Sequence, residues 1–144
     1  MTRIDFYLLD DPTANATLRY ACRLTEKAFL LGHQVYVHTE SAAQSSALDD
    51  LMWTFQAGSF LPHALAGSAA AAEAPVLIGH EALEPPHHEV LINLSAKTPD
   101  CFGTFDRVAE LVGPDETARR QARERYRFYR DRGYPLDTHN LSGS

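Results

Sequence analysis

Arginines dominate one short stretch near the end of this 144-residue chain. Residues 117–132 hold seven arginines against two acids, a local charge of +5, whereas the whole chain carries a formal net charge of −6. The remaining residues therefore carry −11 (−6 minus 5). A localised arginine cluster can hold a phosphate, a carboxylate or an acidic peptide, but an acidic body is repelled by the phosphates of a duplex. The pattern disfavours a protein that wraps nucleic acid.

A helix through this stretch would carry most of its charge on one stripe. At 100° per residue, four side chains fall on one line with two arginines beside them: Arg119, Arg123, Tyr126 and Arg130, flanked by Arg120 and Arg127. Ala118, Ala122 and Tyr129 fall on the opposite side, which suits packing. Few acids neutralise the arginines. Arginines around an exposed aromatic ring are typical of a surface that receives carboxylates and an apolar side chain, and a solvated charged face is the alternative.

A second candidate surface is an apolar cluster within residues 51–63. Five of its side chains crowd into a predicted helix end and the loop beyond it: Trp53, Phe55, Phe60, Leu61 and Pro62. Residues 60–62 are continuously apolar, so they cannot alternate between core and solvent. Clustered exposed aromatics mark a protein partner, whereas burial of all five in the core is an equally compatible interpretation.

The residues required for catalysis or nucleotide binding do not occur in recognisable patterns. The loop after the first predicted strand reads Asp10-Asp11-Pro12-Thr13, which places carboxylates where a phosphate would bind. Neither GxGxxG nor GxxxxGK[ST] nor GxSxG is present. Adjacent side chains such as Asp10 and Asp11 diverge and do not form an acid–base pair. We expect no catalytic residue and no cofactor.

Metal and thiol chemistry are also disfavoured. One segment gathers several possible zinc ligands, but their spacing matches no zinc motif and two prolines interrupt it: His80, His87 and His88 with Glu81, Glu84 and Glu89. A solvated loop is the favoured interpretation. Cys22 lies on an apolar helix face, and Cys101 follows an acid that would raise its pKa. No metal site and no nucleophilic thiol are expected.

The elements that position these residues alternate between strand and helix. Apolar runs predict strands at 3–9, 34–39, 75–79 and 89–94, and three- and four-residue spacing predicts helices at 14–31, 41–55 and from about 115 to Gly133. Residues 105–112 favour a strand over a short helix, and 64–74 read as a surface loop. The order predicts an α/β fold: one Rossmann-like domain over residues 1–136, with a mostly parallel sheet, helices on both faces and a loose tail at 137–144.

Composition sets the broad class of the protein. The chain is 44% hydrophobic and 22% charged, which suits one globular domain. No apolar run approaches the length of a membrane span, and the first residues lack the features of a signal peptide. We expect a cytoplasmic protein without a membrane partner.

Four segments resemble a known family in the family's own order. They are FYLLDD, LMWTFQAGSFLPHALAG, EVLINL and QARERYRFYRDRGYPL, and together they resemble the chi subunit of bacterial DNA polymerase III holoenzyme. The resemblance covers nearly the whole chain and departs mostly at 64–74 and in the tail.

The resemblance implies a non-catalytic clamp-loader accessory with two binding surfaces. One surface would bind the psi subunit, which links the chain to the clamp loader, through Trp53, Phe60, Leu61, Pro62 and His63. The other would bind the acidic C-terminal tail of single-stranded DNA-binding protein through Arg119, Arg123, Tyr126 and Arg127. DNA would be contacted only indirectly. The residues alone leave two alternatives, a small Rossmann-like nucleotide-binding enzyme and a direct binder of single-stranded nucleic acid.

Overall fold

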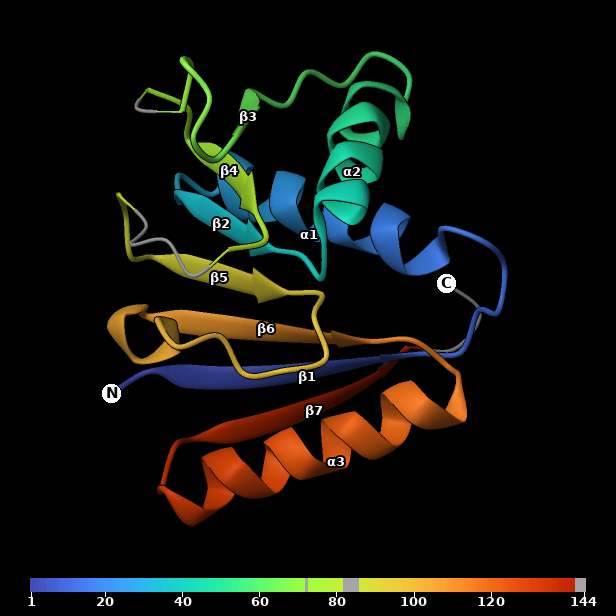
Figure 1. Ribbon diagram of the computed structural model, residues 1–144, viewed down its shortest axis with the longest axis vertical. Coiled ribbons are helices and arrows are strands. Elements are labelled where there is room, and N and C mark those ends of the chain that lie inside the picture. Colours follow the sequence, from blue (N-terminus) through green and yellow to red (C-terminus); the bar gives the residue numbers. More distant parts are fainter. Residues whose placement is uncertain (72, 82–85, 142–144) are drawn as a thin grey trace.

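A single seven-stranded sheet organises the molecule (Figure 1). The computed structural model describes residues 1–71, 73–81 and 86–141. The strand order is β3-β4-β2-β5-β6-β1-β7, and every neighbouring pair is parallel. The strands are β1 (Arg3–Leu9), β2 (Val35–His38), β3 (His63–Leu65), β4 (Val76–Gly79), β5 (Val90–Asn93), β6 (Arg107–Val112) and β7 (Leu136–Leu141).

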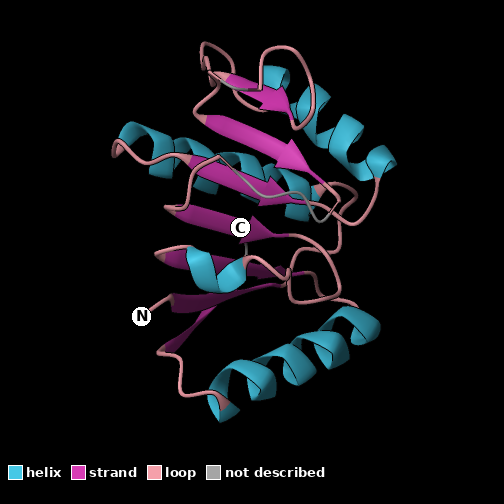
Figure 2. Cartoon of the chain, turned by 60° about the vertical axis from the view of Figure 1, so that its left-hand side comes forward, coloured by secondary structure: helices cyan, strands magenta, loops and turns pink. Residues whose placement is uncertain are grey.

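Helices cover both faces of this sheet (Figure 2). The α-helices are α1 (Ala16–Leu30), α2 (Ala42–Thr54) and α3 (Glu116–Asp131), and a 3-10 turn, η1, spans Phe102–Thr104. Side chains of one strand alternate between two cores, because Val35 and Val37 join the core under α1 and α2 while Tyr36 joins the core under α3. The predicted α/β fold, with a parallel sheet between helices, is therefore confirmed.

Local sequence accounts for the ends of the helices. The Ser41 hydroxyl accepts a hydrogen bond from the Gln44 amide, and the Asp115 carboxylate accepts one from the Ala118 amide, so each side chain caps a helix. Gly32, with φ of 93°, ends α1 in a conformation that disfavours side chains. The strand predicted at 105–112 is confirmed as β6. No helix in the described ranges has the length and hydropathy to cross a membrane.

The C-terminal segment corrects one expectation. Residues 136–141 do not form a loose tail but strand β7, which pairs with β1 from Ile4 opposite Leu136 to Leu9 opposite Leu141. The physical reason is that β7 gains its hydrogen bonds from a strand at the other end of the chain, which local sequence does not reveal. The sequence also did not predict strand β3, which begins at His63 and runs into the loop expected at 64–74. Residues 142–144 lie outside the described residues.

Candidate functional site

Most of the residues predicted for the arginine site line one recess beside α3. It has a volume of about 230 Å³ and lies between α3 and strands β1 and β7. Arg119, Arg123 and Tyr126 line it from the helix, and Ala122 lines its inner wall. The strands contribute Phe6, Leu8 and Thr138. Charged and apolar groups thus meet in one small opening.

The two arginines of this recess differ in how strongly the protein holds them. Arg119 donates from Nε to the Gly113 carbonyl at 3.1 Å and from Nη2 to the Leu9 carbonyl at 2.8 Å. Its guanidinium is therefore fixed at the end of β1. The side chain of Arg123 is 60% exposed, and among the described residues its polar contact is with the exposed carboxylate of Glu116, at 3.3 Å. Because such a surface pair is weak, Arg123 remains available to bind a carboxylate ligand.

Tyr126 and Arg127 lie differently from the sequence expectation. The Tyr126 ring is half-buried, not fully exposed, and its centroid lies 5.5 Å from that of Phe6. Arg127 is exposed and is not among the side chains that line the recess. The structure thus brings three of the four predicted residues together and leaves Arg127 outside the recess.

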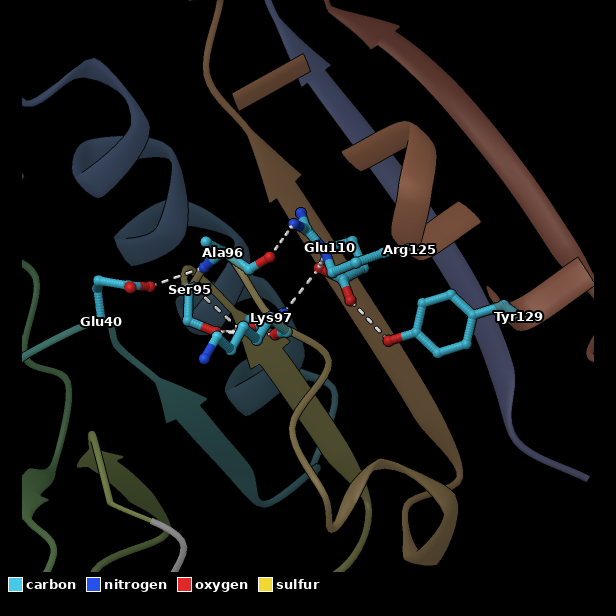
Figure 3. A network of polar contacts seen from close by, with 8 residues as sticks. Glu40, Ser95, Ala96, Lys97, Glu110, Arg125 and Tyr129 are labelled. Carbon is cyan, nitrogen blue, oxygen red and sulfur yellow. Dashed lines mark hydrogen bonds and ion pairs between the residues drawn. The ribbon is translucent and has the colours of Figure 1, made fainter. Parts of the chain in front are cut away.

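A buried polar network fastens α3 to the sheet (Figure 3). Glu110 of β6 is fully buried, and its carboxylate accepts hydrogen bonds from Arg125 Nε at 3.1 Å and from the Tyr129 hydroxyl at 2.6 Å. Asn93 donates to the same carboxylate at 2.9 Å. Arg125 also donates from Nη1 to the Ala96 carbonyl at 2.7 Å. One helix is therefore joined to two strands and a loop through two buried charges.

The charges in this network depend on each other. Burial raises the pKa of Glu110, while the Arg125 charge and the hydrogen bonds from Tyr129 and Asn93 oppose that change. Burial also raises the pKa of Tyr129, so its hydroxyl stays protonated and donates. Arginine guanidinium groups carry a positive charge in proteins. An ionised Glu110 is thus the state that leaves no buried charge unpaired.

The predicted aromatic surface lies on α2 and the segment that leads into β3. Trp53 is 54% exposed and Phe60 is 71% exposed, and their ring centroids lie 6.1 Å apart. The His63 ring lies 4.5 Å from Trp53 by centroids. Trp53 and Phe60 form one exposed apolar patch, which we call the aromatic patch and which also includes the half-buried Pro62.

Two of the predicted residues support the aromatic patch from beneath. Leu61 is 1% exposed and belongs to the core under α2. The covered side chain of His63 places Nδ1 2.6 Å from the Leu61 carbonyl and Nε2 3.2 Å from the Asp49 carbonyl. A partner would therefore touch Trp53 and Phe60, whereas Leu61 and His63 fix the loop that presents them.

The candidate metal ligands do not come together in the described residues. His80 lies 3.6 Å from Glu81, and His88 lies 3.0 Å from the hydroxyl of Thr104. Across residues 1–71, 73–81 and 86–141, no three histidine, cysteine or acidic side chains are placed to share a metal ion. Glu84, another candidate, lies outside the described residues. The cysteines are free thiols, and burial raises the pKa of Cys22 to about 12.

Comparison with known proteins identifies the family of this chain. The family model described as DNA polymerase III chi subunit, HolC, matches residues 1–137. The DNA polymerase III subunit chi of Pseudomonas aeruginosa is 47% identical over 143 residues, which cover 98% of each chain. The chain belongs to the DNA polymerase III chi subunit family. The resemblance seen in its sequence is therefore confirmed.

More distant chi subunits also match this chi-family chain from end to end. That of Haemophilus influenzae is 32% identical over 94% of this chain and 95% of its own. That of Escherichia coli is 32% identical over 96% of this chain and 97% of its own. A crystal structure of T4 UvsW superposes with a TM-score of 0.72 at 9% identity, over 98% of this chain but 42% of that one. The UvsW likeness concerns the fold alone.

Sequence reasoning missed the buried pair of the chi-family chain. Arg125 counted as one more positive charge of the arginine cluster, but it points into the protein. A signal was available, because 100° per residue places Arg125 beside Tyr129 on the inward side of the helix. Glu110 gave a second signal, since an acid inside an apolar strand requires a buried partner.

This pair generates a test by a double-mutant cycle. Glu110→Leu or Arg125→Met alone should each lower the free energy of unfolding by about 3 kcal/mol or more, because each leaves a buried charge without a partner. The double variant should lose clearly less free energy of unfolding than the two single variants lose together, because it leaves neither charge buried. Urea unfolding measures all four proteins. Costs that add to within about 0.5 kcal/mol would contradict the proposed coupling.

Proposed function

We propose that this chain is a non-catalytic accessory subunit that bridges the psi subunit, and through it the clamp loader, to single-stranded DNA-binding protein. The observation that carries the proposal is the position of its two surfaces. The aromatic patch adjoins β3 and the arginine recess adjoins β7. These two strands form the opposite edges of the sheet (Figure 1). Surfaces at opposite ends of one sheet suit two partners bound at once.

The recess has the chemistry to bind an acidic tail. A chain terminus that ends in an apolar side chain needs a cation for its carboxylate and an apolar recess for that side chain. Arg123 supplies the available cation, and Phe6 and Tyr126 supply the apolar wall. Arg119 and Arg127 add positive charge beside them.

The aromatic patch has the chemistry to bind psi. Trp53 and Phe60 are exposed, adjacent and held by covered neighbours. Large aromatic side chains at the centre of an interface carry much of its binding energy. Binding both partners would raise the local concentration of the replicase at coated single-stranded DNA, without any catalysis by this chain.

A crevice beside the sheet argues against the nucleotide-binding alternative. It has a volume of about 850 Å³ and lies at the carboxyl ends of the strands, where Rossmann-like sheets bind ligands. Three carboxylates line it, those of Asp11, Glu40 and Asp115. Negative charge in this position repels a phosphate, so the crevice gives no support to a nucleotide site.

The tail site can be tested by removing its most available cation. Arg123→Ala should weaken binding of the single-stranded DNA-binding protein tail peptide about tenfold or more, because an arginine–carboxylate hydrogen bond contributes roughly 1.5 to 3 kcal/mol. Arg132→Ala is the matched control, since Arg132 lies off the recess against the Phe128 ring. Fluorescence anisotropy at two salt concentrations measures each affinity, which should fall as salt rises.

Equal affinities for wild type, Arg123→Ala and Arg132→Ala would refute the tail site. Tight binding of a naked oligonucleotide that Arg123→Ala abolishes would instead support the direct nucleic-acid alternative. Saturable thermal stabilisation by a nucleotide would support the enzyme alternative.

The psi site can be tested at its two exposed rings. Trp53→Ala and Phe60→Ala should each weaken psi binding by about 2 kcal/mol, roughly 30-fold, while the melting temperature stays nearly constant because both rings are exposed. Leu30→Ala, at a side chain of α1 that is 73% exposed, is the control. Calorimetric titration gives the affinities. A melting temperature that collapses, or an unchanged psi affinity, would show that this patch is not the interface.

A further inference from the structure

The strand at one end of the sheet has an open side. In the described residues, β7 pairs with β1 alone. The Ile4 amide donates to the Pro135 carbonyl, and the Asp10 amide donates to the Leu141 carbonyl, so odd-numbered residues of this segment face β1. Because a strand directs successive backbone groups to opposite sides, the N–H and C=O groups of even-numbered residues point away from the sheet. These residues are Leu136, Thr138 and Asn140.

The open side of β7 adjoins the arginine recess. Phe6 lies opposite Thr138 and Leu8 lies opposite Asn140 in the register of β1 and β7. Phe6, Leu8 and Thr138 all line the recess, so their side chains are on the face that α3 covers. A ligand that places its last side chain in the recess is therefore within reach of outward-pointing backbone groups of β7.

Charge beside the open strand favours an acidic ligand. Both views show α3 running alongside β7 (Figures 1 and 2). Arg123 on this helix is 60% exposed toward the recess. The side chains of Leu136, Thr138 and Asn140 are uncharged, and the one acid of β7, Asp137, forms an ion pair with Arg3. Asp137 lies opposite Asp5 on the other face of the sheet, away from the recess.

We propose that an acidic peptide binds this site as an added strand, with its backbone hydrogen-bonded to the open side of β7 and its acids directed toward the arginines of α3. The inference rests on the proposed tail-binding function and extends it, because it assigns β7 as part of the site. Strand addition supplies affinity through main-chain hydrogen bonds and leaves side chains to give specificity. The recess binds the terminal apolar side chain of the peptide, and β7 binds the extended peptide backbone that precedes this side chain.

Amide hydrogen exchange, followed by NMR on the wild-type chain, tests strand addition. Saturation with the single-stranded DNA-binding protein tail peptide should slow exchange of the Thr138 amide, and of the Leu136 or Asn140 amide, by about tenfold or more. Exchange at Asp137 and His139, whose amides face β1, should change little. This measurement needs no substitution in the strand, so misfolding does not affect it.

A scan of the peptide backbone provides the second measurement. N-methylation at alternate residues of the tail peptide should weaken binding about tenfold, whereas N-methylation at the intervening residues should leave it nearly unchanged. A period of two is expected only when alternate peptide amides face β7. The Arg123→Ala variant, titrated with the unmethylated peptide, reports separately on the recess.

The outcomes separate the two proposals. Peptide binding that depends on Arg123, with unchanged exchange at Thr138 and no period of two, would overturn strand addition and leave the proposed function standing. A peptide that does not bind, or binds equally well to Arg123→Ala, would overturn the proposed function itself. Slowed exchange at Thr138 together with the alternating pattern would support both.

Discussion

The buried pair of Glu110 and Arg125 is the interaction on which the arginine site depends. The inward side of α3 carries the small Ala118 and Ala122 beside the larger Arg125 and Tyr129, and alanines alone pack without fixing how far a helix slides or turns on a sheet. The Glu110 carboxylate fixes both, because it binds two α3 side chains one turn apart. Desolvating two charges is costly, so the pair adds little net stability but strongly favours one position of the helix. That position places Arg123 and Tyr126 over the recess.

The sheet holds the arginine recess and the aromatic patch at its two opposite edges. A parallel sheet buried between helices is stiff, because its strands pack on both faces and its cores lie on either side. The aromatic patch is apolar and adjoins β3, whereas the recess is cationic and adjoins β7. In the proposed function, this difference in chemistry would keep one partner from binding at the other's surface. The remaining charge of the chain is acidic, which discourages direct contact with DNA phosphates.

Several features were predictable from sequence because they depend on local pattern. The buried strands β4 and β5 follow from apolar runs, and the stripe of α3 follows from its helical period. Strand β7 was not predictable, because the segment LDTHNL is polar and gains its partner from the first strand of the chain. The role of Arg125 was missed because counting charges along the helix does not show which side chains point into the protein. The sequence left open whether Trp53 and Phe60 are exposed, and the structure exposes both rings while it buries Leu61, the residue after Phe60.

The central claim is that the two surfaces act independently on one stiff body. Its most direct test is the affinity of the single-stranded DNA-binding protein tail peptide, measured by anisotropy with the chain alone and with the chain saturated by psi. The account predicts dissociation constants that agree to within about twofold, a difference of roughly 0.4 kcal/mol. Displacement of the peptide by psi, with an apparent dissociation constant that rises in proportion to psi concentration, would contradict the account.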